Sequence, residues 1–416
     1  MRKRNVLLVG AGGVAHVAAH KLAQNNDLFG NIFIGSRSID SCKQVLESIE
    51  RKNNYKISSK KIQIKQIDAL DVPEMIKLIK ELNISITINL ASAFCNMSIL
   101  EACIETGCAY IDTAIHEEPN KVCENPPWYA NYEWKRKDRC KDKGITAILG
   151  AGFDPGVVNA YVAYAKKHFF DVIDTIDIMD VNAGSHGKYF ATNFDPEINF
   201  REFMKVWTWI GKKWVCKPVH SEKKVFDFPV VGPQTIYLTG HDELHSLSKN
   251  IDANSIRFWM GFGDHYLNVF NVLKNLGLLS EKPVKTAEGL EVVPLKIVKA
   301  CLPDPKTLAP NYVGNTCIGD LIIGTKDGRK KEFFIYNVCN HKACYEEVES
   351  QAISYTAGVP AVATAMLIVK GDWDTKTMVN VEELNPDPFI NLLKDIGLPT
   401  ETIKVSYSKK NSKTSR

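Results

Sequence analysis

The fold of this chain is constrained most by a glycine-rich turn at its amino end. The apolar run VLLV at residues 6–9 leads directly into Gly10-Ala11-Gly12-Gly13-Val14-Ala15, and a helix-forming segment follows. A buried strand, a G-x-G-x-x-A turn and a helix in this order form the fingerprint of a Rossmann dinucleotide site, whereas glycines alone also mark ordinary turns. The first glycine permits the tight turn, and the second lets the backbone approach a diphosphate at the helix N-terminus. We therefore expect Gly10, Ala11, Gly12, Gly13 and Val14 to bind a dinucleotide.

The choice between the two nicotinamide cofactors rests on the end of the second predicted strand. This strand, residues 31–35, is followed by Ser36-Arg37-Ser38. A carboxylate at this position would bind the ribose 2′-hydroxyl of NAD and repel a 2′-phosphate, but this chain offers a guanidinium and hydroxyl groups. Ser36 and Arg37 therefore predict NADP(H) rather than NAD(H), unless Arg37 is only a solvated residue of a surface turn.

Three further predicted strands end in residues that would face the cofactor if the sheet is parallel and doubly wound. These strands are residues 61–67, 85–90 and 109–112. The first should end beside the adenine, although Asp68 could equally cap the helix predicted at residues 72–82. The other two should end nearer the nicotinamide. The expected contacts from these strand ends are Asp68, Ala69, Asn89, Leu90, Ala91, Asp112 and Thr113.

The order of strands and helices predicts an α/β protein with more than one domain. Residues 1–154 should form an NADP-binding Rossmann domain with a doubly wound parallel sheet, whose sixth strand is residues 144–149. From Val172 the apolar period becomes that of strands, so residues 155–344 should form an α+β substrate and dimerisation domain with a mixed sheet. Residues 345–405 should be helices that pack back on the Rossmann domain, interrupted at Gly358-Val359-Pro360, and residues 406–416 a disordered tail.

Composition argues against several classes of function. The 416 residues are 45% hydrophobic and 24% charged, as in ordinary globular proteins, and lysines in the tail supply a good part of the net charge of +4. We expect no nucleic-acid or membrane partner, because no basic stripe is present and no apolar run approaches the length of a bilayer. The first strand begins at about residue 5, which leaves no room for a cleavable signal, and the 11 cysteines lack paired spacing. The sequence thus predicts a cytoplasmic protein with reduced thiols.

Several longer stretches carry a resemblance to a known family. They are residues 152–159, 182–187, 191–201, 240–245 and 259–265. Over nearly its whole length the chain resembles the saccharopine dehydrogenase family, and more narrowly its carboxynorspermidine (carboxyspermidine) dehydrogenase branch. The resemblance implies NADPH-dependent reductive condensation of L-aspartate 4-semialdehyde with a diamine, putrescine or 1,3-diaminopropane, to carboxyspermidine or carboxynorspermidine. It therefore implies a role in polyamine biosynthesis, and a homodimer.

The resemblance also assigns two parts of the site. In the related saccharopine reductases, the arginine that matches Arg201 binds a substrate carboxylate, and the segment that matches Asp154-Pro155-Gly156 borders the substrate. A tyrosine of those reductases near the fourth strand has no clean match at Ala93-Phe94. Two alternatives stay open. One is a saccharopine-forming reductase of lysine metabolism, which uses a dicarboxylate amine donor and would need a second clamp such as Arg257. The other is a non-catalytic NADP(H)-sensing protein.

The implied reaction needs a group that takes a proton from the attacking ammonium near neutral pH. Among the histidines of the second domain we rank His241 first and His186 second, with Asp154 as a carboxylate at the substrate border; each could instead be structural. His241 and His245 are spaced like metal ligands on a helix. Their segment His-Asp-Glu-Leu-His lacks the H-E-x-x-H order, however, and hydride transfer needs no metal, so no metal site is expected.

The two substrates call for opposite charges. The carboxylate of the semialdehyde suits a bidentate guanidinium such as Arg201, unless that residue is solvated on the first turn of a helix. The far ammonium of the diamine suits carboxylates and an aromatic wall. The candidates for this second role are Asp154, Asp180, Asp242, Glu243, Phe94 and Trp259.

Overall fold

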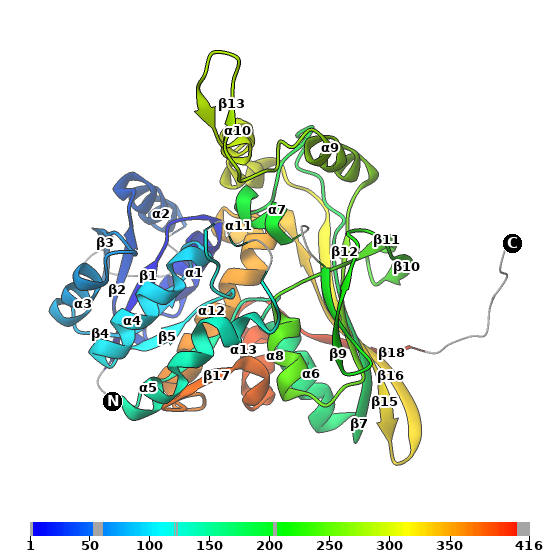
Figure 1. The fold of residues 1–416 in the computed structure, drawn as a ribbon. Coiled ribbons are helices and arrows are strands. Elements are labelled where there is room, and N and C mark those ends of the chain that lie inside the picture. Colours follow the sequence, from blue (N-terminus) through cyan, green and yellow to red (C-terminus); the bar gives the residue numbers. More distant parts are fainter. Residues whose placement is uncertain (1–2, 53–60, 120, 122–123, 203–205, 406–416) are drawn as a thin grey trace, which may run out of the picture.

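The N-terminal sheet develops from the strand that precedes the glycine-rich turn. The computed structural model describes residues 3–52, 61–119, 121, 124–202 and 206–405 (Figure 1). The strands of this sheet are β1 (Arg4–Val9), β2 (Phe29–Ser36), β3 (Ile62–Gln66), β4 (Ile84–Asn89), β5 (Ala109–Ile111), β6 (Ala147–Leu149) and β17 (Met378–Asn380). They are all parallel, in the order β17-β6-β5-β4-β1-β2-β3. The predicted doubly wound Rossmann sheet is confirmed, with one additional strand from the C-terminal part of the chain.

Helices pack on this sheet and bury the apolar runs of its strands. Two of them begin with caps that the sequence supplies. The Ser38 hydroxyl accepts a hydrogen bond from Ser41 N, and the Asp71 carboxylate accepts one from Glu74 N. The helices are α1 (Gly13–Gln24), α2 (Ile39–Arg51), α3 (Val72–Glu81), α4 (Asn96–Thr106) and α5 (Lys137–Asp142), with 3-10 turns η1 (Ala93–Cys95), η2 (Trp128–Asn131) and η3 (Glu133–Arg136).

The second sheet is larger and mixed, as predicted. Its strands are β7 (Val172–Asn182), β8 (Val206–Ile210), β9 (Lys213–Lys217), β10 (Lys223–Phe228), β11 (Gly232–Thr239), β12 (Ser255–Gly261), β15 (Asn315–Lys326), β16 (Arg329–Asn340) and β18 (Glu401–Lys404). The main order is β10-β11-β12-β7-β15-β16-β18, and β8 pairs with β12 and β9. Strands β12 and β7 are parallel, whereas β15 is antiparallel to β7.

Alternation along these strands gives the second sheet two different buried faces. Ile176 and Ile178 of β7 belong to the core that the sheet shares with the Rossmann domain, whereas Met179 belongs to a separate core on the opposite face. In that separate core the ring of Phe226 lies 5.2 Å from the ring of Phe334, although their strands β10 and β16 are far apart in the sheet order. The sheet therefore curls so that its second face covers itself.

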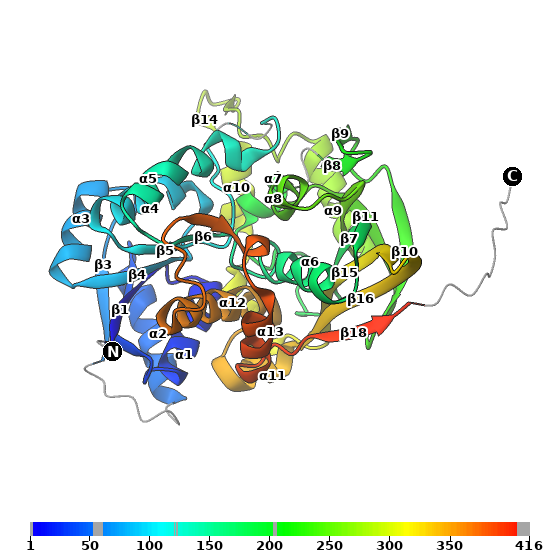
Figure 2. The same cartoon turned by 90° about the horizontal axis from the view of Figure 1, so that it is seen from below.

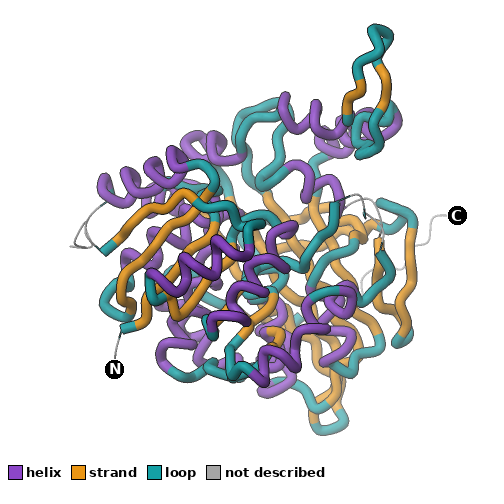
Figure 3. Tube along the Cα trace, turned by 60° about the vertical axis from the view of Figure 1, so that its left-hand side comes forward, coloured by secondary structure: helices purple, strands orange, loops and turns teal. Residues whose placement is uncertain are grey.

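Helices of the second domain lie between the two sheets and around the upper edge of the second one in Figure 1. A small hairpin, β13 (Val284–Lys285) with β14 (Glu291–Val292), stands away from the body of the molecule (Figures 1 and 3). The helices are α6 (Val157–His168), α7 (Pro196–Glu202), α8 (Glu243–Asn250), α9 (Asp264–Asn275) and α10 (Pro294–Cys301), with the 3-10 turn η4 (Pro305–Asn311).

The C-terminal helices differ from the sequence prediction in where they are interrupted. Helix α11 (His341–Val348) ends at Glu349, which has a left-handed φ of 53°, and α12 (Ala352–Lys370) begins after Gln351, whose side chain accepts a hydrogen bond from Ile353 N. Helix α12 then continues through Gly358-Val359-Pro360, so the predicted break there is wrong. Almost all of α12 is buried, and this packing outweighs the backbone hydrogen bond that a proline removes. The turn η5 (Val381–Glu383) and helix α13 (Pro386–Asp395) follow.

Helix α12 also corrects the statement that no segment could cross a bilayer. The helix has 19 residues and a mean hydropathy of 1.7, so it is long and apolar enough to cross a membrane by length and composition alone. However, 83% of its apolar window is buried within the protein. Seen from below, α12 lies beside α1 (Figure 2). It is therefore a core helix, apolar on all sides because protein surrounds it.

Candidate active site

The first glycine of the turn is required by the way the strands converge. Gly10 has a φ of 118°, and its N–H donates to Gly35 O at 2.8 Å, so the chain turns sharply at the end of β1. A Cβ atom at Gly10 would lie 2.5 Å from Leu90 O, at the end of the neighbouring strand β4. A side chain at this position would therefore force apart β1 and β4, between which the strand order reverses.

The second glycine leaves an open approach to the N-terminus of α1. No atom lies within 4 Å of the position that a Cβ of Gly12 would occupy, and Ala15 packs against the sheet with 1% exposure. The first turn of α1 has neither a capping side chain nor an acidic residue. Its free N–H groups and the positive end of its dipole therefore face accessible space, which fits a diphosphate.

The expected cofactor contacts at the next strand ends divide into two groups. Arg37 is exposed, and among the described residues its guanidinium has no acidic partner, so it can bind a 2′-phosphate. Ser36 Oγ instead accepts a hydrogen bond from Ser38 N at 3.3 Å. Asp68 is exposed and accepts one from Leu70 N at 3.0 Å. The alternative role of Asp68 as a helix cap is wrong, because Asp71 caps α3.

At the ends of β4 and β5, two side chains expected near the nicotinamide form hydrogen bonds within the protein instead. Asn89 is buried; its amide donates to Asn96 Oδ1 at 2.8 Å and accepts from Ala91 N at 3.1 Å, which shapes the loop after β4. Asp112 is buried and accepts from Gly150 N at 2.7 Å, and burial raises its pKa to about 7. Leu90 and Ala91 directly follow Asn89, and Thr113 directly follows Asp112. Ala69 O accepts a hydrogen bond from the hydroxyl of Ser98.

His241 has the geometry of a carboxylate-oriented base. Its Nδ1 lies 2.6 Å from Oε2 of Glu243, and its ring stacks on Phe258 with centroids 4.1 Å apart. Glu243 is fully buried in the first turn of α8, so it fixes the imidazole orientation.

The four-residue spacing between His241 and His245 does not make a metal site. His245 is buried between Trp128 and Trp214 and accepts from Trp128 N. Across the described residues no group of three or more His, Cys, Asp or Glu side chains could hold a metal.

Around His241 the fold gathers carboxyl groups from distant parts of the chain. Asp180 of β7 and Asp320 of β15 lie on the same face of the second sheet, because Asp180 pairs with Ile318 and Asp320 pairs with Ile178. Asp242 accepts a hydrogen bond from Ile115 N at 2.7 Å, which links the start of α8 to the segment after β5. We call the whole group the acidic cluster; it consists of Asp112, Glu133, Asp154, Asp180, Asp242, Glu243 and Asp320.

Burial close to one another raises the pKa values of carboxyl groups in the acidic cluster. Burial raises the pKa of Asp180 to about 7, of Asp242 to about 6 and of Glu133 to about 8, and it raises the pKa of Asp320 well above the usual range. Neighbouring negative charges add to each of these shifts. Within the described residues, both carboxyl oxygens of Asp320 and one each of Asp180 and Glu243 are buried without a hydrogen-bond partner. Several acceptors of the cluster are therefore unsatisfied, and the positive charge of His241 opposes the pKa shifts of Asp180 and Asp242.

Arg201 is buried and already paired, so the alternative of a solvated arginine is wrong. It lies in the last turn of α7, not the first. Its guanidinium contacts Glu117 at 2.5 Å and Glu281 at 2.7 Å, and it lies 4.9 Å from the centre of the Phe94 ring. Burial raises the pKa of Glu117 to about 7 even though Arg201 opposes that shift. The residues Glu117 and Glu281 were not predicted, because nothing local in the sequence connects them with Arg201.

Two of the expected site residues lie elsewhere. Trp259 pairs with Met179, on the face of the sheet opposite to Asp180, and its indole N–H donates to Asp177 at 3.0 Å. Because side chains alternate along a strand, Trp259 cannot form a wall for the acidic cluster. His186 accepts a hydrogen bond from Lys188 N and packs edge-on against Tyr312, so the structure does not join it to His241.

The alternative clamp Arg257 is held by the same buried carboxylate as Trp259, with Nε 2.6 Å from Asp177 Oδ1. Another histidine of the second domain, His265, lies at the start of α9 and contacts Tyr189 O. Asp320 was missed, although a single acid inside an otherwise apolar strand is a signal that sequence alone could have supplied.

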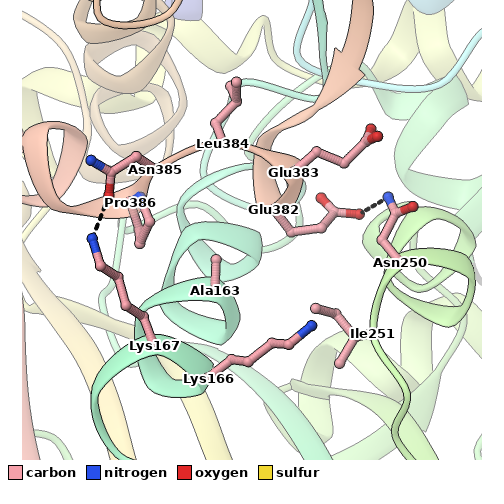
Figure 4. A pocket seen from close by; sticks show the side chains of 10 residues that line it. All are labelled: Ala163, Lys166, Lys167, Asn250, Ile251, Glu382, Glu383, Leu384, Asn385 and Pro386. Carbon is pink, nitrogen blue, oxygen red and sulfur yellow. Dashed lines mark hydrogen bonds between the residues drawn. The ribbon is translucent and has the colours of Figure 1, made fainter.

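A cavity of about 830 Å³ lies away from this site (Figure 4). Helices α6 and α8 begin beside the acidic cluster and end at the cavity, which they line with Lys166, Lys167 and Asn250. Its buried acid, Glu382, accepts hydrogen bonds from Asn250 and Asn159, both at 2.9 Å. Lys167 donates to Asn385 at 2.8 Å, so this acid and this lysine both have partners, in contrast to Asp320 of the acidic cluster, for which the described residues provide none.

Comparison with known proteins agrees with this geometry. The saccharopine dehydrogenase NADP binding domain matches residues 6–148, and the saccharopine dehydrogenase C-terminal domain matches residues 152–398. The chain belongs to the saccharopine dehydrogenase family. This confirms the resemblance and the NADP cofactor, and the open N-terminus of α1 and the exposed Arg37 are compatible with that cofactor. As a member of this family with an NADP-binding domain, the protein is an NADP-dependent oxidoreductase.

Two curated relatives and one solved structure match almost the full length of the chain. Carboxynorspermidine synthase of Vibrio alginolyticus is 48% identical over 394 residues, which cover 94% of this chain and 95% of that protein. Carboxyaminopropylagmatine dehydrogenase of Synechocystis is 41% identical over 403 residues, 95% of this chain and 96% of that protein. Homospermidine synthase of Legionella pneumophila, solved with NAD, has a TM-score of 0.68 at 12% identity, with 100% of this chain and 95% of that chain covered, and shows the same fold.

Proposed function

We propose that the protein catalyses the NADPH-dependent reductive condensation of L-aspartate 4-semialdehyde with a diamine, giving a carboxylated polyamine. The acidic cluster carries this proposal. Buried carboxyl groups that face one another without a cation are destabilising, and a ligand with two ammonium groups neutralises several of them at once. The names of the two full-length relatives, a carboxynorspermidine synthase and a carboxyaminopropylagmatine dehydrogenase, support the same class of amine product.

The semialdehyde also has a complementary partner in the site. Its amino-acid end carries a carboxylate and an ammonium, and the Arg201–Glu117 pair presents one group of each opposite charge. The pair must loosen for the substrate to enter, and a Glu117 pKa of about 7 lets protonation of that carboxyl assist near neutral pH. Phe94 then packs against the guanidinium and excludes water from the pair.

The residues around His241 suit the proton transfers of the condensation. The ammonium that attacks the aldehyde must first lose a proton, and the His241 imidazole held by Glu243 is placed to accept it. The same imidazolium can return a proton when the carbinolamine loses water and forms an iminium ion. NADPH, when bound, supplies the hydride that reduces this iminium carbon. Asp180 and Asp320 hold the far ammonium and so fix the reacting nitrogen in place.

The test is an assay of NADPH oxidation with the semialdehyde and a panel of amines. The panel contains putrescine, 1,3-diaminopropane, agmatine and glutamate. We expect turnover only when the semialdehyde and a cationic amine are both present. Activity with glutamate and 2-aminoadipate semialdehyde would instead identify a saccharopine-forming reductase. NADPH binding without oxidation in any combination would favour a non-catalytic sensor.

We also infer a homodimer and a cytoplasmic location. The edge strand β18 is exposed along its whole length, and an exposed edge can pair with a second copy of the chain. Light scattering should then give twice the chain mass of 46.6 kDa, and a mass of one chain would contradict the dimer. The ten described cysteines are free, which suits a reducing compartment, and cell fractionation tests that location.

A further inference from the structure

Helix α12, from the C-terminal part of the chain, runs parallel to the cofactor-binding helix α1. A Cβ atom on Gly13 would lie 2.6 Å from Ser354 Oγ, and a Cβ on Gly358 would lie 2.7 Å from Val14 O and 2.9 Å from Val17 Cβ. The contacts advance in the same direction along both helices, so their N-termini lie side by side. The first turn of α12 therefore lies next to the glycine-rich turn.

The first turn of α12 contains two donors that the protein itself does not use. Ala352 N donates to His341 Nδ1 at 3.1 Å, and Ile353 N and Tyr355 N donate to the side chain and the backbone carbonyl of Gln351. The amide and the hydroxyl of Ser354 have no acceptor among the described residues. Ser354 is only 5% exposed, and its hydroxyl lies against Gly13. Buried donors without an acceptor are destabilising unless a ligand provides one.

The electrostatics of this place favour an anion. Neither α1 nor α12 has an acidic residue in its first turn, so the positive ends of two helix dipoles add together without a neutralising carboxylate. The open space over Gly12 lies beside them and gives a ligand access. The first turn of α12 lies against Gly13, beside the N–H groups of α1 that would hold a diphosphate.

We propose that Ser354 and the first turn of α12 bind the cofactor diphosphate together with the glycine-rich turn. NADPH is then held by both halves of the protein, since α12 belongs to the matched C-terminal domain and α1 to the NADP binding domain. This explains why position 13 is glycine and position 354 is a small hydroxyl residue: the two helices must approach closely while a donor remains at their junction. The inference rests on the NADP cofactor and is independent of the amine substrate.

A simpler role for Ser354 is close packing against Gly13, in which its hydroxyl contributes nothing to binding. The two roles predict different effects of Ser354→Ala on cofactor binding, because this substitution keeps the close packing and removes the donor. A matched control is Thr364→Val, which removes another buried hydroxyl without an acceptor from the same helix, ten residues further on and therefore roughly 15 Å away. The control should leave cofactor binding unchanged.

Calorimetric titration with three ligands locates the lost contact. NADPH carries the diphosphate, 2′-phospho-ADP-ribose carries it without the nicotinamide, and 2′-AMP represents the adenine end alone. We expect Ser354→Ala to weaken binding of the first two by about tenfold, the value of one charge-assisted hydrogen bond, and to leave 2′-AMP unchanged. Thermal melting in the absence of ligand verifies that both variants are folded.

Three results would overturn the proposal. Unchanged NADPH binding in Ser354→Ala would leave only the packing role. Weaker binding of NADPH but not of 2′-phospho-ADP-ribose would assign the contact to the nicotinamide ribose. Equal weakening for all three ligands would indicate distortion of the whole site. If Ser354→Ala does not fold, Ser354→Cys retains the size of the side chain with a much weaker donor and is expected to give the same pattern across the three ligands.

Discussion

The glycine-rich turn and the acidic cluster are two binding regions built in opposite ways. The turn is six consecutive residues, 10–15, and it works through backbone conformation and small side chains. The acidic cluster consists of seven carboxyl groups that come from β7, β15, η3, the start of α8 and the segments after β5 and β6, and they meet only in the folded protein. The first region fits into a stable fold, whereas the second opposes folding through the repulsion and desolvation of its charges. The glycine-rich turn can therefore be tested by substitutions that add a side chain, and the acidic cluster by substitutions that remove a carboxyl group.

The largest effect is expected from adding a side chain inside the glycine-rich turn. Gly10→Val meets Leu90 O and an unfavourable φ, so we expect a destabilisation of several kcal/mol and loss of NADPH binding. Gly12→Val meets no protein atom, so it should fold with nearly unchanged melting temperature and still lose most of its affinity for NADPH. Melting curves and NADPH fluorescence titration distinguish the two. Normal NADPH affinity in Gly12→Val would remove the diphosphate from this turn.

A large but selective effect is expected in the acidic cluster. Asp320→Asn removes a buried carboxyl group whose two oxygens have no hydrogen-bond partner among the described residues, so we predict a KM for the diamine that rises by roughly 30-fold or more, together with a higher melting temperature of the free enzyme. The control is Glu332→Gln, which also removes a buried acid from the second sheet but lies outside the cluster. A diamine KM that changes equally in both variants would disprove the role of Asp320.

Arg201 is the residue at which the proposed binding of the semialdehyde carboxylate can be tested. Arg201→Ala should raise the KM for the semialdehyde by roughly tenfold to 100-fold and the KM for the diamine much less. Arg257→Ala is the control, because it also breaks an arginine–carboxylate pair, between the half-buried Arg257 and the buried Asp177, on the face of the sheet opposite to Asp180. Equal changes in the two KM values of Arg201→Ala would assign this residue a structural role only.

The smallest effect is a pH dependence of stability. Burial raises the pKa of Asp112 and Asp180 to about 7 and of Glu133 to about 8 in the folded state, above the values expected in the unfolded chain. The folded protein then holds more protons than the unfolded one, so stability from these groups is present in full below about pH 4 and is lost as pH rises to about 8. Putrescine should raise the melting temperature by several degrees more at pH 8 than at pH 5.5.

Asp180→Asn provides the control for this pH dependence. It should flatten the difference in melting temperature between pH 5.5 and pH 8 and reduce the extra stabilisation that putrescine gives at pH 8. An identical effect of putrescine at both pH values in the wild type would contradict a binding site made of ionising carboxyl groups.

The comparison also explains which features sequence could predict. The turn at Gly10 and the doubly wound sheet follow from local order, and the same holds for the proximity of His241 and Glu243, which are two residues apart. Trp259 was placed wrongly because a one-residue difference along a strand reverses the face, and sequence alone does not say which face meets the site. The partners of Arg201 come from segments about 80 residues away, which no local pattern connects.

Helix α12 shows a second limit. Gly358 and Pro360 have the sequence signature of a break, but complete burial against α1 keeps the helix continuous. The continuity of α12 is therefore set by long-range packing and not by local helix propensity. The same packing brings Ser354 to the glycine-rich turn, which sequence reasoning also did not foresee.

The most direct measurement compares a diamine with a monoamine of the same chain length in the NADPH oxidation assay. Putrescine and butylamine have the same reacting amine and differ only in the far ammonium, which the acidic cluster is proposed to bind. We predict that kcat/KM for putrescine exceeds that for butylamine by roughly 100-fold, and that Asp320→Asn removes most of this difference. Comparable kcat/KM values for the two amines in the wild type would contradict the account.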